Sequence, residues 1–319
     1  VHARFASFAA GRVRFVGTAT SGSDHVDAAA LDSLGVAFRA ALGCNARAVA
    51  EYMAAAWLTL AKHRGVALAG RRVGIVGVGH VGSLVAGMAR ALGMVPVLND
   101  PPKARETGGG RYRPLHDLHD CDIVTCHTPL TFDGPDPTYR LIGEAFLERL
   151  QPGAWFCNAG RGEVVDESAL HRALDERRLD AVVLDVWDRE PAIDDRLLAR
   201  VDVGTPHIAG YSLEGKLNGT AIIYRAACEF LGAAPSWDPA AAVPPRGAGL
   251  PIAGFAEGET LHAGLDRRGV AALADTVAAA CPVLRDDEAL RKTVGMSADE
   301  RGRVFDQLRK TYPVRREFS

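Results

Sequence analysis

Three segments of the chain carry an arginine, a glutamate and a histidine in an order that suits the oxidation of a hydroxy acid. The segments are Asn158–Asp166 with Arg161, Asp185–Pro191 with Glu190, and Thr205–Tyr211 with His207. Removing hydride from a secondary alcohol requires a base for the hydroxyl proton, and the imidazole of His207 suits that role. A carboxylate at Glu190 could fix its tautomer, and the planar guanidinium of Arg161 could bind a substrate carboxylate. This chemistry requires no metal ion.

Each of these side chains also has an ordinary structural explanation. An arginine after a strand can be a surface cation, a glutamate before proline can cap a turn, and a histidine after Thr-Pro can be a loop residue. Taken singly, these explanations are as good as the catalytic one. As an ordered set beside a cofactor-binding motif, the three residues favour an active site.

That motif is a glycine-rich string, Gly77-Val78-Gly79-His80-Val81-Gly82, which follows a β-branched run and opens a helical pattern. Gly77 permits a tight turn, Gly79 lets a pyrophosphate approach the backbone, and Gly82 lets helix and strand pack closely. Free N–H groups at the helix start attract phosphates. Asp100 ends the next predicted strand, where a carboxylate would bind the adenosine ribose and favour NAD over NADP, although Asn-Asp-Pro-Pro is also a good turn. We expect His80 to face solvent.

The elements that must position these residues form one repeating rhythm. From about Gly70 to His207, short β-branched runs alternate with helical stretches, which is typical of a parallel sheet with crossover helices. The expected strands are Arg72–Gly77, Val95–Asn99, Asp122–Cys126, Ala154–Asn158, Ala181–Val186 and Asp202–Thr205. They predict an α/β fold with a Rossmann-type doubly wound domain over residues 46–211, whose strand ends carry the catalytic segments.

Two smaller units flank this domain. Strands over Val13–Thr18 and Val36–Arg39, with a helix near Asp27–Leu34, indicate a partial flavodoxin-like substrate domain, made of residues 1–45 and 212–232. Helices over Ala46–His63 and about Leu213–Leu231 would connect the two domains. Residues 233–249 are rich in Pro, Ala and Gly and predict a linker. Residues 250–319, with a helix near Ala271–Ala279, predict a small α+β domain that packs on a partner subunit.

Composition narrows the class of partner. Lys and Arg (37) nearly balance Asp and Glu (39), so no strong positive field recruits nucleic acid or an anionic membrane. The six cysteines show no Cys-x-x-Cys pair or zinc-site spacing, which is typical of reduced thiols in a cytoplasmic protein. No segment approaches the roughly 20 apolar residues that span a bilayer, and no export signal is apparent. We expect a cytoplasmic protein that acts on a small molecule.

The order and spacing of the glycine-rich string, Arg161, Glu190 and His207 resemble the D-2-hydroxyacid dehydrogenase family. The resemblance implies NAD as cofactor, with further cofactor contacts from Val81, Thr128, Ala159, Gly160, Arg161, Asp185 and Gly210, and substrate contacts from Thr20 and Tyr211. Asp185 would reach the carboxamide side of the nicotinamide. As alternatives, Asp185 could be a turn carboxylate, Thr20 a Ser/Thr-turn residue and Tyr211 a hinge aromatic.

Longer strings resemble one branch of that family. They are Phe15–Asp27, Gly43–Ala46, Asp100–Pro102, His207–Lys216, Gly219–Thr220, Leu290–Lys292, Phe305–Lys310 and Arg315–Phe318. That branch oxidises a phosphorylated four-carbon hydroxy acid and dimerises through an extra C-terminal domain, so the resemblance implies a homodimer. Gly160 stands where the branch often has Cys or Ser.

The same resemblance aligns Val1 just after a substrate-holding loop, so we expect a substrate domain that lacks its N-terminal segment. Two alternatives stay open, because a fold alone does not name a substrate. One is a related dehydrogenase of glycerate or phosphoglycerate. The other is a non-catalytic, NAD-sensing corepressor.

Overall fold

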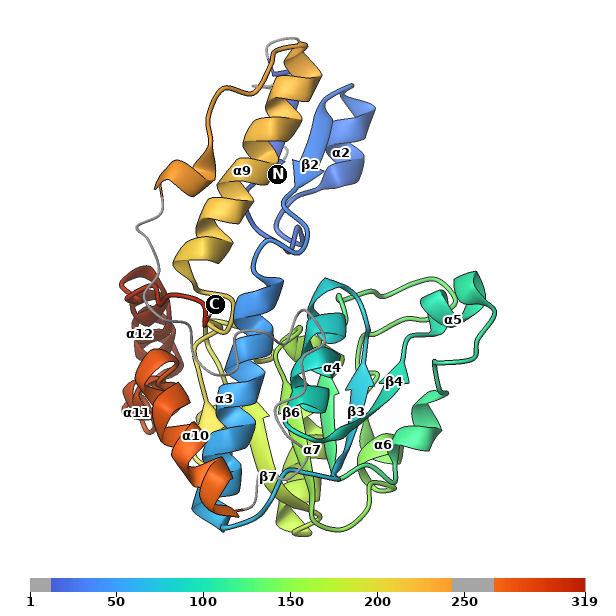
Figure 1. Ribbon diagram of the computed structural model, residues 1–319, viewed down its shortest axis with the longest axis vertical. Coiled ribbons are helices and arrows are strands. Elements are labelled where there is room, and N and C mark those ends of the chain that lie inside the picture. Colours follow the sequence, from blue (N-terminus) through green and yellow to red (C-terminus); the bar gives the residue numbers. More distant parts are fainter. Residues whose placement is uncertain (1–12, 243–266, 319) are drawn as a thin grey trace.

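The computed structural model describes residues 13–242 and 267–318 (Figure 1). Parts of the predicted substrate domain, linker and C-terminal domain fall on residues 1–12, 243–266 and 319 and lie outside the described residues. The division into residues 1–45 with 212–232, 46–211, 233–249 and 250–319 therefore stays a prediction.

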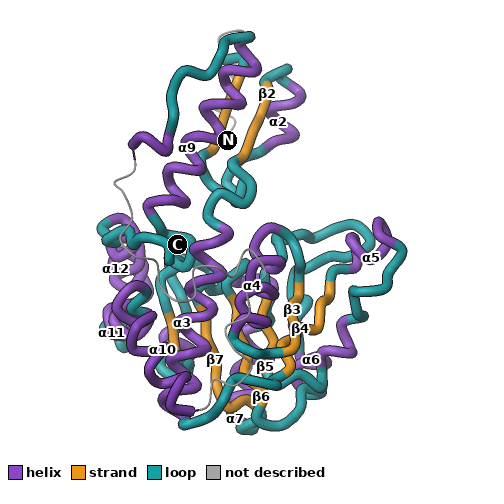
Figure 2. Tube along the Cα trace, in the orientation of Figure 1, coloured by secondary structure: helices purple, strands orange, loops and turns teal. Residues whose placement is uncertain are grey.

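A parallel sheet of six strands forms the centre of the larger unit, in the order β4-β3-β5-β6-β7-β8 (Figure 1). The strands are β3 Arg72–Val76, β4 Val95–Asn99, β5 Ile123–Cys126, β6 Ala154–Asn158, β7 Leu179–Leu184 and β8 Val203–Gly204. Most of their residues are buried, because helices cover both faces of the sheet (Figure 2). The prediction of a doubly wound, Rossmann-type sheet is confirmed. The strand order reverses between β3 and β5, which is where such sheets bind ligands.

Strand β7 differs from its predicted range, since it ends at Leu184 rather than Val186. The chain turns at Asp185, whose buried carboxylate accepts hydrogen bonds from the segment that follows β8. This turn draws two chain segments together at the carboxyl edge of the sheet.

Eight helices and helical turns accompany the sheet in sequence. They are α3 Ala46–Arg64, α4 His80–Ala91, α5 Pro101–Thr107, α6 Glu144–Leu147, α7 Glu167–Asp175, α8 Asp195–Leu198 and the 3₁₀ turns η1 Leu115–Leu118 and η2 Gly162–Val164. Helix α3 is buried along nearly its whole length, with Trp57 at 0% exposure. Helix α4 packs on one side of it and a C-terminal helix packs on another. The expected connecting helix is thus a core element.

The smaller unit stands beyond the carboxyl ends of the sheet (Figure 1). It consists of β1 Phe15–Thr18, α2 Ala28–Ser33, β2 Ala37–Ala40 and α9 Leu213–Leu231. Strands β1 and β2 pair in parallel, and α9 packs against both. The predicted strands and helices are present in this unit, and its assignment as a substrate domain stays a prediction.

Described residues of the C-terminal region form α10 Arg267–Ala280, α11 Val283–Arg291 and α12 Ala298–Lys310. Helix α10 packs on α3 of the same chain, and its apolar residues belong to the same hydrophobic core as α3 and the sheet. The C-terminal region therefore covers a core of its own chain, whether or not it also contacts a partner subunit. The sequence predicted an α+β domain here. Within residues 267–318, however, the structure has helices, no strand and one isolated β-bridge, between Arg315 and Ser212. Residues 315–318 are held there by ion pairs and by separate backbone hydrogen bonds instead of a β-ladder. Across the described ranges, no helix is both long and apolar enough to cross a membrane.

Candidate active site

The glycine-rich turn between β3 and α4 has the close approaches that only glycine allows. Gly77 adopts a left-handed φ of 84°, and an added Cβ at Gly82 would lie 1.9 Å from the Gly77 carbonyl oxygen. A Cβ at Gly79, by contrast, would have no described atom within 4 Å. The turn is therefore closed on its strand side and open at the position where a pyrophosphate would approach the backbone.

Asp100 stabilises this turn from the end of β4. Its Oδ2 accepts a hydrogen bond from the Val78 N–H at 2.9 Å, and its Oδ1 accepts from the Lys103 N–H at 3.0 Å, which caps α5. Lys103 Nζ donates back to the Val78 carbonyl at 2.5 Å. The turn role that the sequence left open is thus present, and contact with a ribose stays a prediction.

Thr128 lies beside the glycine turn, where β5 ends. Its Cγ2 would be 2.7 Å from a Cβ at Gly77. The Thr128 hydroxyl and the Nδ1 of His127 are both buried without a hydrogen-bond partner in the described part of the chain. A buried polar atom without a partner is costly, so a bound group that supplies one is favoured. The open space at Gly79 and this unsatisfied hydroxyl fit a dinucleotide.

His207 and Glu190 form a direct pair. The two side chains meet at 2.8 Å between Nδ1 and Oε2, and they are 33% and 20% exposed. The second oxygen of Glu190 accepts the Trp187 N–H at 3.0 Å, which fixes the carboxylate. Because the carboxylate accepts a hydrogen bond from Nδ1–H, the neutral ring keeps its proton on Nδ1 and has Nε2 as its proton acceptor. This tautomer is inferred from the hydrogen-bond network.

Asp185 holds the segment that carries His207. Its carboxylate, 1% exposed, accepts bonds from the Thr205 hydroxyl at 2.6 Å and from the N–H groups of Ile208 at 2.8 Å and Ala209 at 3.0 Å. Burial raises the pKa of Asp185, against the lowering effect of His207 and these donors. The sequence assigned Asp185 to the nicotinamide carboxamide, and the structure adds a positioning contact that the sequence did not reveal.

Arg161 reaches across to the smaller unit. Its Nε and Nη2 donate to Asp24 Oδ2 at 2.8 and 2.7 Å, and its Nη1 donates to the carbonyl of Gly160 at 2.8 Å. Gly22 allows this approach, because a Cβ there would lie 1.9 Å from Arg161 Nη2. Sequence reasoning missed Asp24. It stands in the Phe15–Asp27 string that carried the resemblance, but nothing there indicated a partner 137 residues away.

The turn after β6 is rigid on both sides of Arg161. The Asn158 side chain donates to the Arg161 carbonyl at 2.8 Å and accepts the Gly160 N–H at 3.0 Å. A Cβ at Gly162 would lie 1.9 Å from the carbonyl carbon of Trp187, so the arginine turn abuts the glutamate turn. At Gly160 a Cβ would lie 3.1 Å from the Thr128 carbonyl oxygen, which leaves little room for a larger side chain such as Ser or Cys. Ala159 packs against the core.

The remaining predicted contacts lie around the crossing between the two units. Thr20 donates to the Gly22 carbonyl at 2.7 Å, as a Ser/Thr-turn residue does. Tyr211 packs edge-on against Tyr312, with ring centroids 5.9 Å apart, as a hinge aromatic would. Neither geometry tests a substrate contact.

The other positions in this crossing are tightly packed. A Cβ at Gly210 would lie 2.1 Å from Asn45 Nδ2. Val81 packs partly buried against the core. His80 is exposed as expected, but its ring also covers Gly43, where a Cβ would lie 2.6 Å away.

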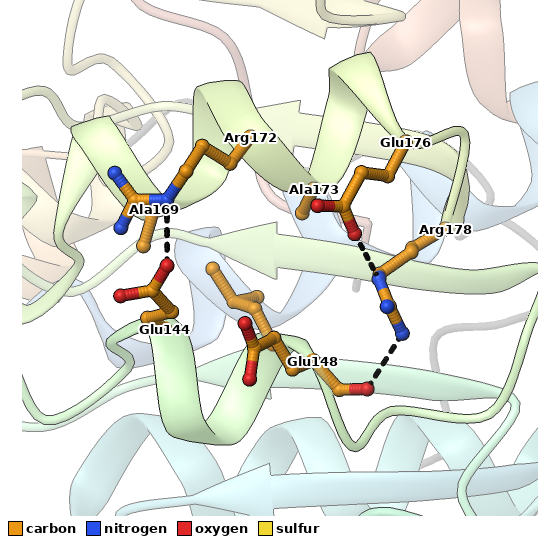
Figure 3. Close-up of a pocket in the computed structure, with 8 residues that line it drawn as sticks. Glu144, Glu148, Ala169, Arg172, Ala173, Glu176 and Arg178 are labelled. Atoms are coloured by element: carbon orange, nitrogen blue, oxygen red, sulfur yellow. Dashed lines mark hydrogen bonds and ion pairs between the residues drawn. The ribbon is translucent and has the colours of Figure 1, made fainter.

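A pocket lies between α6 and α7, away from the residues described so far (Figure 3). Its charged groups pair with one another, Arg172 with Glu144 at 2.9 Å and Arg178 with Glu176 at 2.5 Å. Arg178 immediately precedes β7, so this pocket lies at the amino edge of the sheet, away from His207. No group of three or more metal-binding side chains occurs in the described ranges.

Comparison with known proteins places these features in one family. Residues 40–209 match the model of the D-isomer specific 2-hydroxyacid dehydrogenase NAD-binding domain. Erythronate-4-phosphate dehydrogenase of Cronobacter sakazakii is 46% identical over 308 residues, which cover 96% of this chain and 77% of that protein.

Solved structures agree on the fold. NAD-dependent formate dehydrogenase from Staphylococcus aureus, in complex with NAD, is 26% identical with a TM-score of 0.59, covering 71% of this chain and 74% of that one. D-lactate dehydrogenase from Aquifex aeolicus has a TM-score of 0.61 at 24% identity, covering 73% and 80%. The predictions of an NAD cofactor and an oxidoreductase are confirmed by the family match. The chain belongs to the D-isomer specific 2-hydroxyacid dehydrogenase family.

Proposed function

We propose that the chain oxidises 4-phospho-D-erythronate to (R)-3-hydroxy-2-oxo-4-phosphooxybutanoate with NAD, a step toward pyridoxal 5′-phosphate. The observation that carries the reaction type is the His207–Glu190 pair at 2.8 Å, at the carboxyl edge of an NAD-binding sheet. The substrate is supported by the relative named erythronate-4-phosphate dehydrogenase, whose similarity extends over 96% of the chain.

In this proposal His207 acts as the base. Its Nε2 accepts the proton of the C2 hydroxyl while the C2–H bond breaks, and the C–O bond becomes a carbonyl. NAD, when bound, accepts the hydride. Glu190 stabilises the imidazolium that forms, because its carboxylate already lies against Nδ1. In the reverse direction the same imidazolium returns the proton.

Arg161 binds the substrate carboxylate and places C2 near His207. Its guanidinium now donates twice to Asp24, which is 52% exposed, so a substrate carboxylate would compete with an accessible partner. A planar guanidinium suits this exchange since its donors form a fixed fork. The pyrophosphate and adenosine side of NAD would lie along the glycine turn and the end of β4, at Gly79, His80, Val81, Gly82 and Asp100.

The other assigned residues would complete the two binding sites. Those assigned to the nicotinamide and its ribose are Thr128, Ala159, Gly160, Asp185 and Gly210. Thr20 and Tyr211 would contact the substrate.

We also propose a homodimer in the cytoplasm. The C-terminal region exposes apolar side chains at Leu284, Val294, Met296 and Val314, each 36% to 40% exposed, which a second copy could cover. The six cysteines are buried and unpaired, which suits a reducing compartment. Sedimentation of the purified chain as a monomer at micromolar concentration would contradict the dimer.

The substrate test is NADH formation, followed by absorbance, with 4-phospho-D-erythronate, glycerate and 3-phosphoglycerate in parallel. We expect the first to give the highest kcat/KM, and a preference for either of the others would overturn the substrate. NAD binding without turnover of any of them would instead favour the corepressor alternative.

The role of His207 is tested by His207→Gln, which should abolish turnover and leave NAD bound. A matched control is His171→Gln, because His171 forms a similar pair with Asp194 at 3.0 Å outside the site. Turnover of the His207 variant near that of the control would remove His207 as the base.

A further inference from the structure

The last described residues, 312–318, run between the first turns of α3 and α9, where Figure 1 marks the C-terminal end. The Leu213 N–H donates to the Arg315 carbonyl at 2.9 Å, beside the isolated bridge between Ser212 and Arg315. This C-terminal tail is remote in sequence from both helices. It nevertheless touches the starts of both.

These helix starts are where the chain passes between the two units. The passage from β2 into the sheet-bearing unit ends at Ala46, where α3 begins, and the return passage ends at Leu213, where α9 begins. Ser212 lies five residues after His207. A contact that joins these two points therefore acts on the hinge and on the segment that carries the proposed base.

Arg315 grips the α3 side of the hinge. Its Nη1 donates to Glu51 Oε2 at 2.8 Å, and its Nη2 donates to the Ala48 carbonyl at 2.6 Å. Glu51 is 0% exposed, and its other oxygen accepts bonds from the Phe318 N–H at 2.9 Å and from Arg47 at 3.1 Å. A carboxylate this deeply buried is stable only while its cationic partners stay in place.

Glu317 grips the α9 side. Its Oε1 accepts a bond from the Ser212 hydroxyl at 2.9 Å, and that hydroxyl also caps α9 by accepting the Gly215 N–H at 2.9 Å. The Glu317 N–H donates to Glu214 at 2.9 Å, and Arg316 pairs with the same carboxylate at 2.5 Å. The tail thus forms hydrogen bonds to both hinge segments, the starts of α3 and α9, through its side chains and its backbone.

We propose that residues 312–318 are a clamp on the interdomain hinge, with Arg315 as a positioning residue that fixes the starts of α3 and α9 relative to each other. The clamp sets how the smaller unit stands over the site, and so where Asp24 and Thr20 lie relative to Arg161 and His207. A tail that only adds stability would leave this geometry unchanged when weakened.

Arg315→Lys tests the clamp. Lysine keeps a positive charge beside Glu51 but lacks the fork that reaches both Glu51 and the Ala48 carbonyl. The matched control is Arg291→Lys. Arg291 also binds a carboxylate, that of Asp287 at 2.6 Å, and two backbone carbonyls, those of Leu198 and Val201. These carbonyls lie in the segment that leads into β8, away from the hinge.

Both variants should lower the melting temperature. Only Arg315→Lys should raise the KM for 4-phospho-D-erythronate, by about tenfold, which corresponds to the loss of one charged hydrogen bond. Its Kd for NAD should stay within about twofold of wild type, because the glycine turn lies outside the clamp. Equal KM values for the two variants would overturn the proposal.

The KM comparison rests on the proposed function. A measurement of the distance between the two units tests the clamp without any substrate. Spin labels at Ser33→Cys on α2 and Glu106→Cys on α5, both exposed, report the separation of the two units. Arg315→Lys should broaden the distance distribution relative to wild type and Arg291→Lys. If Arg315→Lys folds poorly, Glu317→Ala releases the α9 side and should broaden it too. Unchanged distributions would refute the clamp even if the substrate were another hydroxy acid.

Discussion

Glu167, the first residue of α7, should make the stability of the protein depend on pH. Its Oε1 accepts the Asp188 N–H at 3.0 Å, in the turn that leads to Glu190. Burial raises the pKa of Glu167 to about 7; the nearby carboxylates of Asp188 and Asp194 add to this rise, while the Asp188 N–H and Arg189 oppose it. We expect Glu167→Gln to remove this dependence while keeping an acceptor for Asp188.

The magnitude follows from linkage between protonation and folding. A pKa that rises from 4.5 in the unfolded chain to about 7 in the folded protein corresponds to at most about 3 kcal/mol of unfolding free energy. Because the folded state holds the proton more tightly, this contribution is fully present below pH 4.5 and is lost as pH rises through about 7. Wild type should therefore lose up to about 3 kcal/mol relative to Glu167→Gln between these pH values.

Urea unfolding followed by tryptophan fluorescence at pH 5, 6, 7 and 8 measures this difference. Additional measurements at intervals of about half a pH unit near pH 7 would locate the transition more sharply. Glu163→Gln serves as the control, because it removes a carboxylate from the neighbouring turn η2. The difference in unfolding free energy between Glu167→Gln and wild type should grow with pH, whereas the control should show a constant one. A constant difference for Glu167→Gln would refute the assigned burial effect.

Three further substitutions probe the site itself. Gly162→Ala places a Cβ 1.9 Å from the Trp187 carbonyl carbon, so thermal unfolding should show a loss of about 1–3 kcal/mol and kcat should fall with it. Thr128→Val removes a buried hydroxyl that has no partner in the described chain, so fluorescence titration should show NAD binding weakened about tenfold, while the stability of the free protein should rise by about 1 kcal/mol. Glu190→Gln should lower kcat about a hundredfold with NAD affinity unchanged, and a kcat within about twofold of wild type would contradict its role.

Much of the fold could be predicted because its signals are local. The β-branched runs and the glycine string fix strands, turn and helix within about ten residues of chain. The neighbourhood of Glu190 and His207 was also predictable, since both follow strands whose carboxyl ends share one edge. Their 2.8 Å separation adds the hydrogen bond that the sequence could only suggest.

Contacts between distant segments were not predictable. Glu51 lies in an apolar helix, and its partner Arg315 comes 264 residues later, so no spacing rule connects them. The same holds for Asp24 and Arg161, which belong to different units. The prediction that the C-terminal region packs on a partner subunit overlooked its contact with α3. The sequence of α3 shows that the helix is apolar on most sides, but it does not show which segment of the chain covers it.

The residues proposed for chemistry stand on short turns, and each turn is fixed by a polar side chain that bonds backbone. Asp185 holds the segment of His207, Asn158 holds the turn of Arg161, and Asp100 holds the glycine turn. Turns without such ties would fluctuate by more than a hydrogen bond tolerates, and a displacement of about 1 Å can cost a hundredfold in rate. Substituting these holders should therefore affect catalysis through position, even where they never contact substrate or cofactor.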